Sequence, residues 1–159
     1  MRFKYKILWV LGSLTFSLFL QGQTKKVQKI ERNVPLVVLE AFNKTYQGKD
    51  PVWFSSYQGR DSQKLVFEGK FLLDNRYCVA IYDINGNQLA FAASVEYKEV
   101  PEAARIYMTE NYPTIPVVQR LLVTSSKKII TYELGVYIDN EFVIMVFSKE
   151  GDFIKITRG

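Results

Sequence analysis

The segment Tyr77-Cys-Val-Ala-Ile-Tyr-Asp-Ile-Asn-Gly-Asn-Gln-Leu89 decides the fold, because a second version of it follows near the end of the chain. That version reads Phe142-Val-Ile-Met-Val-Phe-Ser-Lys-Glu-Gly-Asp-Phe-Ile154. In both, an apolar run meets a short polar turn with glycine and then resumes, which is typical of a β-hairpin. The correspondence extends back to Val34-Pro35 and Val100-Pro101. We interpret the chain as a domain over residues 34–159 with two repeats, 34–97 and 100–159.

The hydrophobic pattern predicts one helix followed by four antiparallel strands in each repeat. Apolar residues three and four apart after Pro35 predict a helix, and Gly48 is a suitable end for it. Alternating apolar and polar residues from Lys64 predict a half-buried strand, and Asp74-Asn75 predicts a tight turn. The second repeat predicts a helix that ends at Tyr112-Pro113. The expected class is α+β: two tandem α-β-β-β-β repeats, with helices packed on one face of an antiparallel sheet.

The N-terminal segment, residues 1–22, has the layout of a secretory signal peptide. Three basic residues precede an apolar run from Ile7 to Leu20, which is shorter than the roughly 20 residues of a membrane span. Its removal takes three positive charges away and lowers the formal net charge from +5 to +2. Residues 23–33 are polar and are expected to form a mobile lead-in. We therefore predict a periplasmic or secreted protein that has no stable membrane span and does not bind nucleic acid.

The sequence offers little for catalysis. The chain has no histidine, which removes histidine-containing triads and zinc sites, and it has no glycine-rich phosphate loop. Its one cysteine, Cys78, lies in a strand pattern and is expected to be a small buried hydrophobic residue. Asp83 fits a hairpin turn better than a calcium loop, and Glu68 and Glu133 fit repeat symmetry better than an acid/base pair. We predict no enzyme activity, no cofactor and no metal.

Several apolar residues fall on the strand positions that we expect to face away from the helices. Aromatic residues and methionine that cluster on an exposed face are typical of a binding surface. The alternative is that the N-terminal segment or the curvature of the sheet covers some of them. The predicted partner-binding residues are Tyr82, Tyr137, Met145, Phe147 and Phe153. If they form a surface, Phe147→Ser should change the stability by less than about 1 kcal/mol.

The order of these elements resembles a known family. Val34-Pro35 and Val100-Pro101 before the helices, Phe67-Glu68 on a strand and Asp83-x-x-Gly86 in a hairpin are similar to the PepSY-like, β-lactamase-inhibitor-protein-like (BLIP-like) family of exported Bacteroidetes-type proteins. The resemblance covers residues 34–159 and implies a small exported domain without known catalysis. In that superfamily, inhibitor proteins hold another protein on the concave face of the sheet. No inhibitory contact residue has a recognisable match in this chain.

These observations predict an exported, non-catalytic binding domain. The expected partner is an unidentified protein or peptide held on the open face of the sheet, as in an inhibitor or a chaperone. The alternative is a periplasmic carrier of a small molecule or a lipid, with apolar residues lining a cleft. The sequence leaves open the oligomeric state and whether the two repeats share one sheet.

Overall fold

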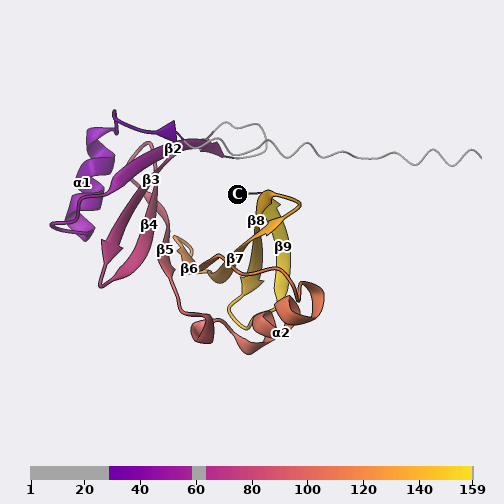
Figure 1. Cartoon of the computed structure of the whole chain (residues 1–159). Helices are drawn as coiled ribbons and strands as arrows, with labels where there is room; N and C mark the ends of the chain where they lie inside the picture. The colour runs from indigo at the N-terminus through magenta and orange to yellow at the C-terminus, as the bar shows by residue number, and fades with distance from the viewer. Residues whose placement is uncertain (1–28, 59–63, 159) are drawn as a thin grey trace, which may run out of the picture.

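In the computed structural model, residues 29–58 and 64–158 are described, and they form one continuous antiparallel sheet with two helices (Figure 1). The predicted signal peptide and most of the predicted lead-in lie outside these residues. The sheet has the order β1-β2-β3-β4-β5-β6-β7-β8-β9, so every strand pairs with its neighbours in sequence. The elements are β1 (Lys29–Ile30), α1 (Leu36–Thr45), β2 (Val52–Gln58), β3 (Lys64–Leu73), β4 (Arg76–Asp83), β5 (Gln88–Ser94), the 3₁₀ turn η1 (Tyr97–Glu99), α2 (Glu102–Asn111), β6 (Gln119–Ser125), β7 (Ile130–Ile138), β8 (Glu141–Ser148) and β9 (Phe153–Arg158).

The predicted fold class is wrong. We expected an α+β fold of two tandem α-β-β-β-β repeats with helices packed on one face, whereas the described chain is mostly antiparallel sheet, curved into a half-barrel, with two helices of 10 residues each. Pairing between β5 and β6 joins the strands into a single sheet, so they do not separate into two units. Each helix buries two side chains, which is too little to form a helical layer over nine strands.

The tight turns form where the sequence predicts them. Asp74 and Asn75 have φ values of 48° and 61°, and Asp139 and Asn140 have 50° and 63°. Positive φ at both central residues is the geometry of a two-residue type I′ hairpin, and Asp and Asn tolerate it better than most residues. These two turns fix the register of the β3–β4 and β7–β8 pairs, and through them the face on which each side chain lies.

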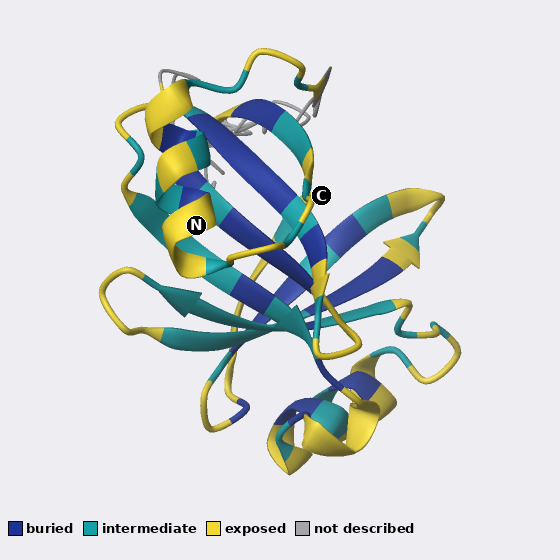
Figure 2. Cartoon of the chain, turned by 90° about the vertical axis from the view of Figure 1, so that its left-hand side faces the viewer, coloured by how far each residue is buried: buried dark blue, intermediate teal, exposed yellow. Residues whose placement is uncertain are grey.

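The curvature gives the sheet an outer face, against which the helices lie, and a helix-free inner face (Figure 1). Under α1, Val38 and Phe42 pack against outer-face side chains of β3 and β4 that include Phe71 and Cys78. Figure 2 shows the buried side of α1 turned toward the strands and its exposed side toward solvent. Leu36, the first residue of this helix, is 69% exposed.

A second cluster lies under α2, where Ala104 and Met108 pack against Leu134 and Met145 of β7 and β8. The two clusters share the outer face, because the register runs from Cys78 of β4 through Ala93 and Leu122 to Tyr132 of β7. Cys78 is 1% exposed, and burial raises the pKa of its thiol, so the prediction of a buried cysteine is confirmed.

Candidate binding surface

The inner face carries a band of aliphatic side chains across the centre of the sheet. Val79 of β4, Ala92 of β5 and Leu121 of β6 form a cluster with Ile81 and Val123 packed around it. The register places them together, because Val79 pairs with Ala92 and Ala92 pairs with Val123. This cluster does not contact the helices and faces the inside of the curve. We call it the inner-face cluster.

Charged and polar groups border the inner-face cluster on β2 and β3. Glu68 pairs with Ile81 in register and is 3% exposed, and the Ser56 hydroxyl donates a hydrogen bond of 3.4 Å to its carboxylate. The Lys70 ammonium lies 4.2 Å from the centre of the Phe54 ring, a cation–π distance. The inner face therefore combines an apolar centre with a few oriented polar groups, an arrangement typical of binding sites.

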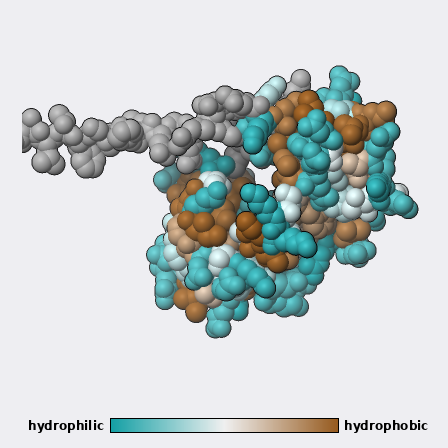
Figure 3. Space-filling view, turned by 180° about the vertical axis from the view of Figure 1, so that it is seen from behind, coloured by the Kyte–Doolittle hydropathy of each residue, from teal (hydrophilic) through white to brown (hydrophobic). Residues whose placement is uncertain are grey.

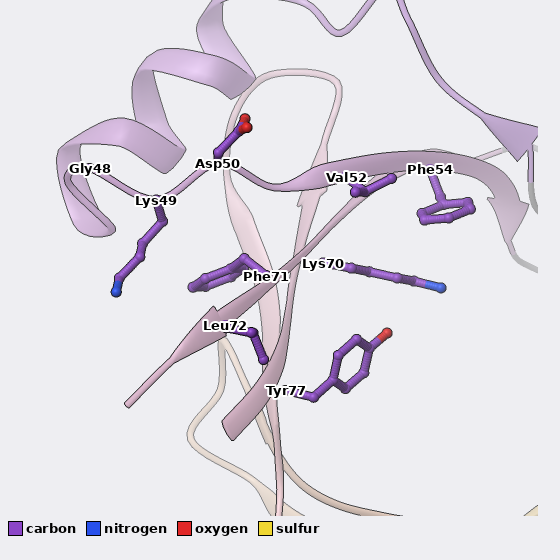
Figure 4. Close-up of a pocket in the computed structure, with 9 residues that line it drawn as sticks. All are labelled: Gly48, Lys49, Asp50, Val52, Phe54, Lys70, Phe71, Leu72 and Tyr77. Carbon is purple, nitrogen blue, oxygen red and sulfur yellow. The ribbon is translucent and has the colours of Figure 1, made fainter. Parts of the chain in front are cut away.

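A cleft of about 570 Å³ opens at one end of this face, over the ends of β2, β3 and β4. Val52, Leu72 and Tyr77 contribute exposed apolar surface, at 55%, 66% and 37%. Figure 4 shows the Lys70 side chain extending between the Phe54 and Tyr77 rings. Burial, with a smaller contribution from the charge of Glu68, raises the pKa of the Tyr77 hydroxyl above its ordinary value.

The predicted binding residues do not form one surface. Tyr82 is 1% exposed, and Met145 and Phe147 are both 0% exposed, so these three are core residues of the outer face and the face predicted for them is wrong. The error has a physical cause: β4 and β8 are apolar on both faces, so their sequences carry no alternation from which the direction of a side chain could be read.

Tyr137 and Phe153 are exposed, at 58% and 39%, but on opposite faces. Tyr137 pairs with Phe142 on the inner face, and their ring centroids are 5.4 Å apart. Phe153 lies beside α2 on the outer face, where it stacks on Tyr107 with a centroid distance of 4.8 Å. Their role in partner binding stays a prediction.

The inner-face cluster itself was missed from the sequence. Its members are ordinary aliphatic residues, and only the register between β4, β5 and β6 brings them together. A weak signal was present, because Ala90 and Ala92 alternate with larger apolar residues along β5 and thereby mark the inner face of that strand.

From behind, apolar side chains lie in patches on both arms of the curved sheet, separated by hydrophilic ones (Figure 3). Among the described residues, no group of three or more His, Cys, Asp or Glu side chains could hold a metal ion. No helix in the described part of the chain has the length and apolarity to cross a membrane.

Comparison with known proteins identifies the fold. A DUF2874 family protein from Bacteroides uniformis superposes with a TM-score of 0.61 at 19% identity, over 78% of this chain and 88% of that one. A candidate periplasmic protein from Bacteroides eggerthii superposes with a TM-score of 0.63 at 14% identity, over 79% of this chain and 89% of that one. A BLIP-like protein from Bacteroides fragilis superposes with a TM-score of 0.56 at 15% identity, over 80% of this chain and 88% of that one. At these identities the similarity shows a shared fold.

No protein-family model matches the chain, and no curated protein matches it either. The BLIP-like part of the predicted resemblance agrees with the Bacteroides fragilis structure, whereas none of the three descriptions is PepSY-like.

Proposed function

We propose that this protein is an exported, non-catalytic binding domain that holds a protein or peptide on the inner face of its sheet. The observation that carries the proposal is the apolar inner face, which neither helix covers. Its central cluster of Val79, Ala92 and Leu121 is 4–8% exposed, and exposed apolar side chains lie on the same face. These exposed side chains include Leu72 and Tyr137, at 66% and 58%. A specific interface needs about 800 Å² from each partner. One face of a nine-stranded sheet can supply that area.

Two findings support an exported binding protein. The first is the layout of residues 1–22, which is typical of a signal peptide and agrees with the periplasmic description of the Bacteroides eggerthii neighbour. The second is the fold shared with a BLIP-like protein, because the resemblance implies a superfamily in which the sheet holds another protein. We infer a non-catalytic role from the composition, since the chain has no histidine and its one thiol is buried with a raised pKa.

The test is crosslinking capture from the native cell envelope with matched surface variants. Leu72→Asp and Tyr137→Asp place charges on exposed inner-face positions, and Ile106→Asp places one on the outward side of α2, where Ile106 is 48% exposed. We expect the wild type and Ile106→Asp to capture the same protein and the two inner-face variants to lose it. Equal capture by all four proteins would show that the inner face is not the binding surface.

The second candidate is a carrier of a small apolar molecule, and the cleft of about 570 Å³ over β2–β4 favours it. Its apolar walls at Val52, Phe54 and Leu72 suit a ligand that is largely apolar. Native mass spectrometry of the purified protein distinguishes the two functions. A small molecule that copurifies, and that Leu72→Asp releases, would favour the carrier.

A further inference from the structure

A second pocket lies on the outer face, away from the proposed partner surface. Its volume is about 290 Å³ and it opens beside the C-terminal end of α2. Arg120 of β6 belongs to the outer face, because it pairs in register with Leu134, a core residue beneath α2. Its wall includes Tyr97, Met108, Tyr112, Ile115, Val117 and Arg120.

The half-buried guanidinium of Arg120 is held in place by main-chain carbonyls. Its Nε–H donates to the Val95 carbonyl at 3.3 Å, and one terminal nitrogen donates to the Val117 carbonyl at 3.3 Å. A guanidinium has five N–H groups, so three remain for another acceptor. None of the ion pairs in the described chain involves Arg120. A partly buried charge usually has a partner of opposite sign, and here protein carboxylates do not supply it.

The acidic residues nearest Tyr97 in sequence are already engaged, and Glu110, near the end of α2, is exposed to solvent. Glu96 and Glu99 flank Tyr97, and each forms an ion pair with a basic neighbour, at 2.8 and 3.0 Å. The Arg105 guanidinium lies 6.0 Å from the centre of the Tyr97 ring and adds positive charge on that side. The carbonyl end of α2 carries partial negative charge, so the attraction for an anion has to come from Arg120 itself.

The corresponding space beneath α1 is filled. Trp53 of β2 packs its indole against Phe42 of α1, with centroids 5.4 Å apart, and lies over Gly69 across the ladder. Beneath α2 the strand residue across from Leu134 is Arg120, whose side chain turns to the carbonyls described above. A large apolar side chain closes the gap between helix and sheet, whereas the arginine leaves an opening with a cation in it.

We propose that this pocket binds a carboxylate joined to a small apolar group, with the Arg120 guanidinium as its anchor. Arginine presents paired N–H groups in the geometry that a carboxylate accepts. Met108, Ile115 and Val117 supply apolar wall, and the Tyr97 and Tyr112 hydroxyls are further potential donors. At the roughly 30 Å³ that a water molecule occupies in the liquid, the pocket has room for about ten non-hydrogen atoms. The carboxylate could belong to the C-terminal residue of a peptide or to a free aromatic acid.

Chemical-shift titration of the ¹⁵N-labelled protein tests the proposal with three probes: acetyl-Gly-Leu-Phe as the free acid, the same peptide as the C-terminal amide, and 4-phenylbutyrate. We expect the free acid to saturate, to shift the Tyr97, Tyr112 and Val117 amides, and to bind at least tenfold more tightly than the amide. Equal affinity of the free acid and the amide would overturn the proposal. If 4-phenylbutyrate binds as tightly as the peptide acid, a free acid is the source; if only the peptide binds, a C-terminus is.

Arg120→Lys keeps the charge and removes the paired N–H groups. We expect this change to weaken the binding of the free acid at least fivefold. The matched change Arg158→Lys, at an arginine half-exposed on β9, should leave the affinity unchanged. A folded Arg120→Lys protein with wild-type affinity would refute the role of Arg120 as the anchor for the carboxylate. If that variant does not fold, the comparison of acid and amide on the wild type still decides. Shifts confined to the inner face would also overturn this proposal, and they would support the proposed function instead.

Discussion

Replacing Phe147 by alanine tests the placement of this residue in the core rather than on a surface. Phe147 is 0% exposed. The centre of its ring lies 5.5 Å from the ring centre of Tyr107 in α2 and 5.9 Å from that of Phe153 in β9, and both contacts are edge to face. Burial of a phenylalanine and the cavity left by its removal together cost about 3–5 kcal/mol. Because Phe147 lies in the middle of the core cluster under α2, we expect a loss of about 4 kcal/mol in the free energy of unfolding.

Tyr137→Ala is the matched control. Tyr137 is 58% exposed and has one aromatic neighbour, Phe142. Its loss should therefore cost about 1 kcal/mol or less. Urea denaturation followed by circular dichroism measures both variants. With a slope of about 2 kcal/mol per molar urea, Phe147→Ala should lower the midpoint by about 2 M and Tyr137→Ala by about 0.5 M. Equal midpoints for the two variants would refute the core placement and restore the surface predicted from the sequence.

Four further predictions concern Tyr82, Tyr46, Gly86 and Asp83. Tyr82→Phe should raise the stability by about 1 kcal/mol, because the buried hydroxyl has no hydrogen-bond partner in the described chain. Tyr46→Phe should lower it by about 1 kcal/mol, because that hydroxyl accepts a glutamine N–H at 3.0 Å. Thermal melts check both variants, and a loss of stability in Tyr82→Phe would show that the Tyr82 hydroxyl has a hydrogen-bond partner. At Gly86 φ is +80 and a Cβ would lie 2.8 Å from a carbonyl oxygen of α1, whereas Gly48 has φ +71 and open space around it. Gly86→Ala should therefore cost about 2–4 kcal/mol and Gly48→Ala about 1–2 kcal/mol. Equal losses of unfolding free energy for the two variants, measured by urea denaturation, would exclude the close approach of position 86 to α1. Burial raises the pKa of Asp83, but hydrogen bonds from two backbone N–H groups and an asparagine side chain outweigh it and leave the pKa below its ordinary value of 3.8. The carboxylate therefore stabilises the fold above about pH 4, and this contribution is lost as the pH falls through the folded-state pKa. Asp83→Asn should flatten the dependence of the urea midpoint on pH between about 5 and 3, and parallel profiles would contradict this.

The sequence predicted the parts of the fold that depend on local chemistry. Asp74-Asn75 and Asp139-Asn140 specified two hairpins, because few other residues take positive φ at two successive positions. The second strand of each hairpin begins directly after its turn, β4 at Arg76 and β8 at Glu141. These features depend on residues close in sequence, and no tertiary contact is needed to specify them.

The sequence failed where the answer depended on pairing between distant strands. Met145 and Tyr137 were assigned to one face, but the register sets Leu134 opposite Met145 and Phe142 opposite Tyr137, so their side chains point in opposite directions. The fold class failed for a related reason. The sequence suggested two separate units, but β5 pairs with β6, with Ala92 opposite Val123, and this pairing joins the strands into one sheet. No local sequence pattern predicts this pairing.

The alternation of a strand also makes the two proposed sites separable. Arg120 and Leu121 are adjacent on β6, yet Arg120 lines the pocket beside α2 and Leu121 belongs to the inner-face cluster. Successive side chains of a strand point to opposite faces, so a change at one position leaves the contacts of the other in place. Arg120→Lys should therefore weaken the binding of a carboxylate probe while envelope capture persists, and Tyr137→Asp, at an exposed inner-face position, should do the reverse. If both changes altered both activities, the two faces would be coupled through the backbone of the sheet, and a ligand in the outer pocket would then regulate the partner held inside.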